Sequence, residues 1–273
     1  MDLTIANKNT EEFSNLIKSK ERNVAEGDLK IGVDLGTANI VIAVVDQNNR
    51  PVAGVIREAN VVRDGIVVDY INATRIVKEL KIEIEKILGF KISETATAIP
   101  PGIIEGNTKV IKNVVKAAGF EITKVVDEPT AAAIFLGIND GAVVDVGGGT
   151  TGISILKNKK VIYTTDEATG GTHMSLVIAG AYNITLENAE KIKKDINKES
   201  ENFVIIEPVV EKMASIVKKA IKDYEVEKAY IVGGACTFKR FSEVFYKELG
   251  IDVIKPANPL LVTPLGIAMC SNN

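Results

Sequence analysis

Two stretches of the chain repeat one arrangement of residue types that suits a polyphosphate. Each has an apolar run, an Asp, a glycine-containing turn that ends on Thr, and a second β-branched run. The stretches are residues 31–43 and 143–155. Their key residues are Asp34, Gly36 and Thr37 in the first, and Asp145, Gly147, Gly148, Gly149 and Thr150 in the second.

These residue types favour binding of phosphate together with a divalent cation. Glycine lets backbone N–H groups approach an anion, Thr adds a hydroxyl donor, and an Asp beside phosphate is tolerated when a cation lies between them. A single copy would be interpreted as an ordinary tight hairpin, but the repeated order of Asp, Gly and Thr favours a pair of loops. The pattern predicts two hairpin turns that face each other and hold a polyphosphate with Mg2+.

Two other short segments could contribute to the same chemistry. Glu128 opens an Ala-rich helix and could orient a water molecule beside a phosphate. An acid at a helix start is also favoured by the helix dipole, and this alternative stays open. Gly170 and Gly171, in a Thr-Gly-Gly-Thr turn, could bring the backbone close to a ligand.

Two further segments are candidates for contact with the rest of a nucleotide. Glu190 and Lys193 lie one turn apart on an expected helix, where they could hydrogen-bond a ribose or a base edge, or form a surface ion pair. A small-residue turn follows a buried strand, where backbone N–H groups commonly meet ligands; it consists of Gly233, Gly234 and Ala235.

Length and composition exclude several classes of function. At 273 residues the chain is long for one hydrophobic core, so two lobes are expected. A net charge of −3 gives no electrostatic footprint for nucleic acid, and no apolar run approaches the ~20 residues of a membrane span. The two cysteines have no metal-ligand spacing, so we expect a reduced, cytoplasmic setting.

The elements expected around these residues form an α/β arrangement written twice. Three strands are followed by alternating helices and strands, first from residue 29 and again from residue 142. We expect lobe I at 28–139 plus 258–273 and lobe II at 140–257. Residues 1–27 are expected to be a loosely packed leader, because few apolar residues support the short amphipathic helix that 10–20 could form.

The order of these motifs resembles the actin-like ATPase superfamily, in its DnaK-type chaperone and MreB branch. This resemblance implies a two-lobe fold of duplicated ribonuclease-H-like domains, compact and with reduced insertions, that closes on Mg-ATP. Four segments resemble more closely the EutJ family of ethanolamine-utilization proteins, which is encoded with ethanolamine ammonia-lyase and microcompartment components. They are VRDGIV at 62–67, PPG at 100–102, DEATGG at 166–171 and TPL at 263–265.

The resemblance implies a role for each candidate residue. Asp34 and Asp145 would position hydrated Mg2+, and Glu128 would orient the attacking water. The loops would cradle the β- and γ-phosphates, through Gly36, Thr37, Gly147, Gly148, Gly149 and Thr150. The adenosine of ATP or ADP would contact Glu190, Lys193, Lys194, Gly233, Gly234 and Ala235, with Gly170 and Gly171 bringing further backbone close.

The sequence departs from the chaperone pattern in three places, and the first two bear on hydrolysis more than on binding. Gly152 stands where chaperones and MreB carry an acid, the span 57–69 lacks their inserted lobe with its catalytic Lys, and Lys239 is the candidate substitute for their adenine-stacking Arg. The sequence therefore indicates a chaperone-like protein that binds Mg-ATP, with slow or partner-stimulated hydrolysis.

The implied partner is an ethanolamine-pathway enzyme, for example ethanolamine ammonia-lyase, or a microcompartment component, and the implied location is the cytoplasm or a bacterial microcompartment. The alternatives are a filament-forming actin-like protein, a non-hydrolysing nucleotide-binding scaffold and, ranked lower, a small-molecule kinase. Neither nucleic acid nor membrane is an expected partner.

Overall fold

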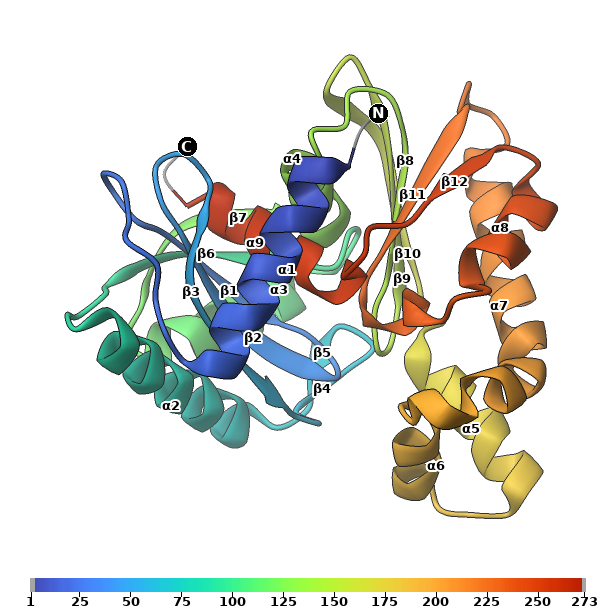
Figure 1. Cartoon of the computed structure of the whole chain (residues 1–273), viewed down its shortest axis with the longest axis horizontal. Helices are drawn as coiled ribbons and strands as arrows, with labels where there is room; N and C mark the ends of the chain where they lie inside the picture. Colours follow the sequence, from blue (N-terminus) through green and yellow to red (C-terminus); the bar gives the residue numbers. More distant parts are fainter. Residues whose placement is uncertain (1–2, 272–273) are drawn as a thin grey trace.

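The computed structural model describes residues 3–271, which form two five-stranded sheets side by side (Figure 1). In each sheet three antiparallel strands continue into two parallel ones. The first sheet has the order β3-β2-β1-β6-β7 and comprises β1 (Lys30–Leu35), β2 (Asn39–Val45), β3 (Pro51–Glu58), β6 (Glu94–Ile99) and β7 (Glu121–Asp127). The second has the order β10-β9-β8-β11-β12 and comprises β8 (Gly141–Val146), β9 (Thr151–Lys157), β10 (Lys160–Glu167), β11 (Lys228–Val232) and β12 (Asp252–Ile254).

Helices cover both faces of both sheets. On the side of the first sheet, which we call lobe I, lie α1 (Thr4–Ser19), α2 (Tyr70–Leu88), α3 (Glu105–Ala117) and the small hairpin of β4 (Val62–Arg63) and β5 (Ile66–Val67). On the side of the second, which we call lobe II, lie α5 (Gly171–Tyr182), α6 (Leu186–Lys193), α7 (Glu199–Ile221), α8 (Phe241–Leu249) and the 3₁₀ turns η1 (Ile196–Lys198) and η2 (Gly234–Thr237). Between the sheets lie α4 (Glu128–Leu136) and α9 (Val262–Met269), the latter preceded by η3 (Pro259–Leu261).

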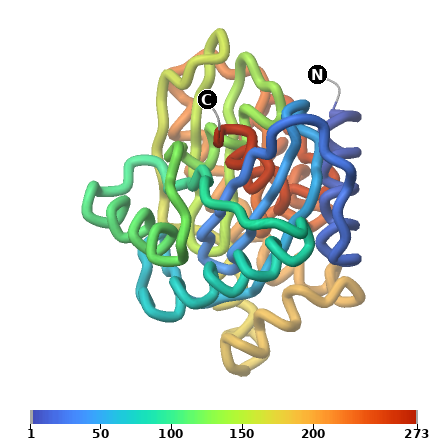
Figure 2. Tube along the Cα trace, turned by 90° about the vertical axis from the view of Figure 1, so that its left-hand side faces the viewer, coloured from blue at the N-terminus to red at the C-terminus, as the bar shows by residue number. Residues whose placement is uncertain are grey.

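Alternate side chains of β2 pack into two separate hydrophobic clusters, one on each face of the sheet. Ile40, Ile42 and Val44 pack with residues of α2 and α3, whereas Val41 and Ala43 pack with α1 and α9. Because successive side chains of a strand point to opposite faces, an apolar run such as β2 can serve both. Figure 2 accordingly shows α1 and α3 on opposite sides of the molecule.

The two central helices approach each other unusually closely. A Cβ at Gly266 of α9 would overlap the carbonyl of Ala131 in α4, so only glycine fits there. The neighbouring Ala132 and Ala133 of α4 pack with residues of β8 and β11 in the second sheet. The chain passes between the lobes beside this crossing, at 137–140 and at 255–258. The helix pair is therefore the central support of the molecule.

The prediction of a loosely packed leader at 1–27 is wrong for residues 4–19, because these residues form helix α1. Phe13 is fully buried and Leu16 nearly so, and α1 lies along β3. Ala6 joins a second apolar cluster, with residues of α4, β8 and β11, and the amide of Ala257 donates to Asn7 Oδ1 at 2.9 Å. A few apolar residues suffice here because the partner surface already exists in the fold, which sequence periodicity does not report.

Substitution of Phe13 by Ala should lower the free energy of unfolding by about 3–5 kcal/mol, the usual loss for a fully buried aromatic side chain. The midpoint of denaturant-induced unfolding measures this change. Ile5→Ala on the same helix is the control, since Ile5 is 74% exposed and should change stability by less than about 0.5 kcal/mol. Equal midpoints for wild type and Phe13→Ala would show that α1 does not dock in solution.

Lobe II differs from expectation at helix boundaries. The helix expected at 208–223 begins at Glu199 and contains Pro208 within it. Proline removes one backbone hydrogen bond, but Phe203, Ile206 and Val210 bury a continuous apolar stripe that stabilises the longer helix. The helix expected at 238–249 begins at Phe241, and the edge strand β12 was not expected.

Candidate functional site

The two glycine turns lie against each other at the boundary of the lobes. The first joins β1 and β2, the second joins β8 and β9, and both strand pairs are antiparallel with continuous register up to the turn. A Cβ at Gly148 would lie 3.0 Å from the Cβ of Ala38 and 3.2 Å from its amide nitrogen. The turns thus face each other, as the repeated pattern predicts.

A cleft of about 470 Å³ opens beside this contact and is lined by both lobes. All but one of the candidate residues line it: Asp34, Gly36, Thr37, Glu128, Asp145, Gly147, Gly148, Gly149, Thr150, Gly171, Glu190, Lys193, Lys194, Gly233, Gly234 and Ala235. Gly170 does not. It lies behind the second turn, where a Cβ would stand 2.6 Å from the carbonyl carbon of Gly149. Its N–H donates to Nδ1 of His173, which caps the start of α5.

Three carboxyl groups come from the ends of three elements: Asp34 near the end of β1, Asp145 near the end of β8, and Glu128 as the first residue of α4. Burial and then the neighbouring Asp145 raise the pKa of Asp34 to about 7. Burial also raises the pKa of Asp145 to about 6, although the Thr263 hydroxyl donates to its Oδ2 at 2.5 Å. Burial, followed by Asp145 and Asp34, raises the pKa of Glu128 well above its usual range.

Asp166 is a fourth carboxyl group near the site, and it was not among the predicted site residues. It lies across β9 from Asp145, since Gly152 pairs with Asp145 on one side and with Asp166 on the other. Burial raises its pKa to about 7, and Asp145 and Asp64 add to the effect. The signal in the sequence was its place two strands from Asp145 in the repeated meander.

This arrangement fits a hydrated cation beside a polyphosphate. Carboxylates that disfavour one another's ionisation are stabilised in the ionised form by a nearby positive charge. Among residues 3–271, no three His, Cys, Asp or Glu side chains group closely enough to coordinate a metal ion directly. Glycine is required in the turns because a Cβ at Gly36 or Gly149 would lie 2.8 Å from atoms of Asn39 or Asp64.

At the other end of the cleft, Glu190 and Lys193 are hydrogen-bonded to each other and also line the cavity. Lys193 Nζ lies 2.6 Å from Glu190 Oε2 and 2.9 Å from the carbonyl oxygen of Gly171, and Ser175 donates to Glu190 as well. The ion pair that the sequence allowed is therefore present, and both residues line the cleft, whereas a hydrogen bond to a ribose or a base edge stays a prediction. Gly233 adopts φ +94°, a conformation that favours glycine, and its amide donates to Pro259 at 3.0 Å.

The structure shows what surrounds each of the three positions that depart from the chaperone pattern. A Cβ at Gly152 would lie 3.1 Å from Pro129 and 3.3 Å from Pro101, so prolines surround the place of the acid. The span 57–69 carries the β4–β5 hairpin, and Asp64 at its turn lies next to Gly149. Lys239 is not among the residues that line the cleft.

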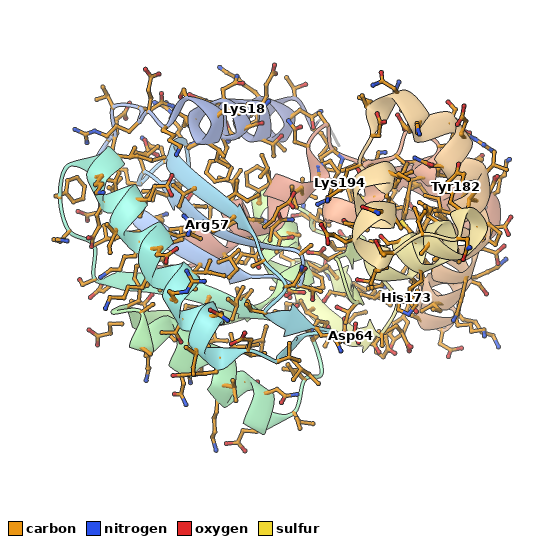
Figure 3. All side chains as sticks on the ribbon, turned by 90° about the horizontal axis from the view of Figure 1, so that it is seen from below. Lys18, Arg57, Asp64, His173, Tyr182 and Lys194 are labelled. Carbon is orange, nitrogen blue, oxygen red and sulfur yellow. The ribbon has the colours of Figure 1, made fainter. Side chains whose placement is uncertain are left out.

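One ion pair crosses the mouth of the cleft. Lys194 Nζ, after α6, lies 2.9 Å from Glu58 Oε1, at the end of β3, and no local pattern in the sequence predicts this pairing. In Figure 3, Lys194 of lobe II lies on the boundary with lobe I, as does Asp64 of the hairpin. The Glu58 side chain is 75% exposed, so the pair contributes little to overall stability.

If the cleft binds the nucleotide that the sequence predicts, removal of this pair by Glu58→Gln should accelerate nucleotide release by about 2-fold without a change in melting temperature, because an exposed pair contributes at most ~1 kcal/mol. The dissociation rate of a fluorescent ADP measures the effect, which salt should reduce in the wild type. Glu225→Gln is the matched control, since it breaks an exposed pair with Lys157 within lobe II. A release rate that is unchanged at low salt would contradict the prediction.

Two sheets of this topology, with two central helices and paired glycine turns, define an actin-like ATPase fold. The crystal structure of MreB5 of Spiroplasma citri bound to AMPPNP has this fold, with a TM-score of 0.71 and 18% identity over 88% of this chain and 95% of the other. A family profile, type IV pilus assembly protein PilM, matches residues 137–264.

Within that fold, the chain belongs to the family of the ethanolamine utilization protein EutJ. It is 43% identical to EutJ of Escherichia coli (strain K12) over 244 residues, which are 89% of this chain and 86% of the relative. The crystal structure of EutJ from Carboxydothermus hydrogenoformans matches with a TM-score of 0.92 and 49% identity, over 98% of this chain and 99% of that one. These findings confirm the resemblance and the fold class. None of the helices in residues 3–271 is long and apolar enough to cross a bilayer.

Proposed function

We propose that this protein binds Mg-ATP between its lobes, hydrolyses it slowly or with the help of a partner, and acts as a chaperone-like factor in ethanolamine utilization. The observation that carries the proposal is the contact between the two glycine turns beside Asp34, Asp145 and Glu128. A cavity of about 470 Å³ lies within the range of small-molecule sites.

The residues of the cleft divide into three tasks. The N–H groups of the two glycine turns and the hydroxyls of Thr37 and Thr150 would bind the phosphates. Asp34 and Asp145 would hold Mg2+ through water, and the ion would supply neutralisation of the charge on the transferred phosphoryl group. Glu128, whose pKa burial and the neighbouring acids raise, is a stronger base when ionised than an exposed glutamate, and it would orient and deprotonate the attacking water.

The partner follows from the family. Relatives carry the name ethanolamine utilization protein, and the sequence motifs are of the chaperone type. We infer that the client is an ethanolamine-pathway enzyme, such as ethanolamine ammonia-lyase, or a microcompartment component. Recovery of lyase activity after denaturation, with this protein and either ATP or no nucleotide, tests the inference; equal recovery in both would contradict it.

One observation favours a second candidate, a nucleotide-binding scaffold that does not hydrolyse ATP. Pro101 and Pro129 surround Gly152, so the shell of acids found in chaperones is incomplete at this position. Asp166, on the adjacent strand, is the nearest acid that could take its place.

Calorimetric titration of Mg-ATP into the wild type and Asp145→Ala, followed by phosphate release on the same samples, separates these functions. Binding that Asp145→Ala weakens, with slow release, supports the proposal. Tight binding without release favours the scaffold. Strong light scattering on addition of ATP would indicate filaments, and no binding at millimolar ATP would overturn nucleotide binding altogether.

A further inference from the structure

One lysine holds three consecutive carbonyl groups of the loop that ends η2. The Lys255 ammonium lies 3.0 Å from the carbonyl oxygen of Cys236, 3.5 Å from that of Thr237 and 2.5 Å from that of Phe238. Lys255 follows β12, at the point where the chain leaves lobe II, so the contact closes a span of 17–19 residues.

Burial of the Lys255 ammonium in this contact costs free energy, because a charged group loses hydration. Burial lowers the pKa of Lys255, which means that the ammonium has lost part of its hydration. No carboxylate in residues 3–271 lies within ion-pairing distance of Lys255. The compensation comes from backbone carbonyls at the end of a 3₁₀ turn, where the peptide dipoles leave partial negative charge.

The loop so held forms one wall of the cleft. Gly234, Ala235, Thr237 and Phe238 all line it. Besides Lys255, this wall is held by hydrogen bonds from the Gly233 amide to Pro259 and from the Cys236 thiol to the carbonyl of Gly233 at 3.1 Å, and by the burial of Cys236 and Phe238 in the core of lobe II. The second glycine turn is held by different hydrogen bonds. The Gly147 amide donates to the carbonyl of Thr150, and the Thr172 hydroxyl donates to the carbonyl of Gly148.

We propose that Lys255 is a positioning residue for the nucleoside end of the cleft, fixing the 234–238 wall so that the protein binds the base and ribose as well as the phosphates. This inference rests on the proposed nucleotide function and deepens it. Lys255 makes none of the hydrogen bonds described for the glycine turns. Its removal should therefore weaken contacts with the nucleoside while leaving contacts with the phosphates unchanged.

The test compares Mg-ADP with Mg-tripolyphosphate, which has no nucleoside, by calorimetry. For Lys255→Met we expect roughly 10-fold weaker ADP binding, equivalent to the loss of one charged hydrogen-bond anchor, and tripolyphosphate binding within about 2-fold of wild type. Lys255→Arg should recover most of the ADP affinity. Lys81→Met is the matched control, since Lys81 also donates to a backbone carbonyl, that of Gly119, but in lobe I.

Equal losses for the two ligands, or no loss for either, would overturn the proposal. Amide hydrogen exchange in the nucleotide-free protein gives an independent arm: residues 234–238 should exchange faster in Lys255→Met than in Lys81→Met. If Lys255→Met fails to fold, Lys255→Arg carries the test, with a smaller loss confined to ADP. A wild type that binds neither ligand would refute the nucleotide function itself, whereas the exchange result would still report on the role of Lys255 in the loop.

Discussion

At pH 8 the Asp34→Asn variant should melt at a higher temperature than the wild type in the absence of nucleotide, and it should lose Mg2+-dependent nucleotide binding. The folded protein raises the pKa of Asp34 from 3.8 to about 7 through burial and Asp145. The protonated carboxyl therefore stabilises the fold fully below pH 3.8, and this contribution is lost as the pH rises through 7. Asparagine carries no charge at any pH and avoids the loss.

The full shift would correspond to about 4 kcal/mol, but Asp34 faces an open cleft, so we expect about 1–2 kcal/mol and a rise of a few degrees. Melting curves between pH 5 and 8 measure it: the wild type should lose more stability across this range than the variant. Asp223→Asn, at an exposed position after α7, is the control. Parallel pH profiles for wild type and Asp34→Asn would contradict the account of the carboxyl cluster.

Glu128→Gln should reduce the rate of ATP hydrolysis by about 100-fold or more while leaving nucleotide affinity nearly unchanged, since general-base assistance typically contributes 10²–10⁴-fold. Glutamine keeps the size of the side chain at the first position of α4 but cannot accept a proton. Because Glu128 adds like charge to Asp34 and Asp145, its neutralisation should not weaken binding of Mg-ADP. Single-turnover phosphate release and calorimetry together measure the two effects.

The control for this variant is Glu105→Gln, which also removes an acid from the first position of a helix, α3. It separates loss of the base from loss of a favourable helix-dipole contact. Equal hydrolysis rates in wild type and Glu128→Gln would assign Glu128 to the helix start alone, the alternative that its position in the sequence leaves open.

The site was predictable from the sequence because its parts are local patterns. Each glycine turn carries its own strand period, Asp and Thr, so the hairpins could be located without knowledge of the fold. Their repetition then predicted that the turns face each other, and Gly148 does lie against Ala38. Gly170 shows the limit of such patterns, since a glycine can serve loop packing rather than the cavity.

What could not be predicted depends on contacts between distant parts of the chain. No local sequence pattern distinguishes Lys255 from other lysines. Its contact with residues 236–238 depends on the position of β12 in the fold. Glu58 and Lys194 are 136 residues apart and meet only when the lobes are placed. Pro208 indicates a helix boundary by local rules, and the buried stripe of α7 overrides it.

Helix α1 packs on β3 at the outer surface of the molecule, on the side nearest the viewer in Figure 1. Its Phe13 end is anchored on β3, while Ala6 and Asn7 contact the core beside α4 and the connecting segment at Ala257. A rotation of the lobes that widens the cleft would shift the Phe13 end of α1 relative to the end that carries Ala6 and Asn7. Residues 4–19 therefore connect the two lobes outside the α4–α9 pair, and the contacts at the two ends of α1 depend on the angle between the lobes.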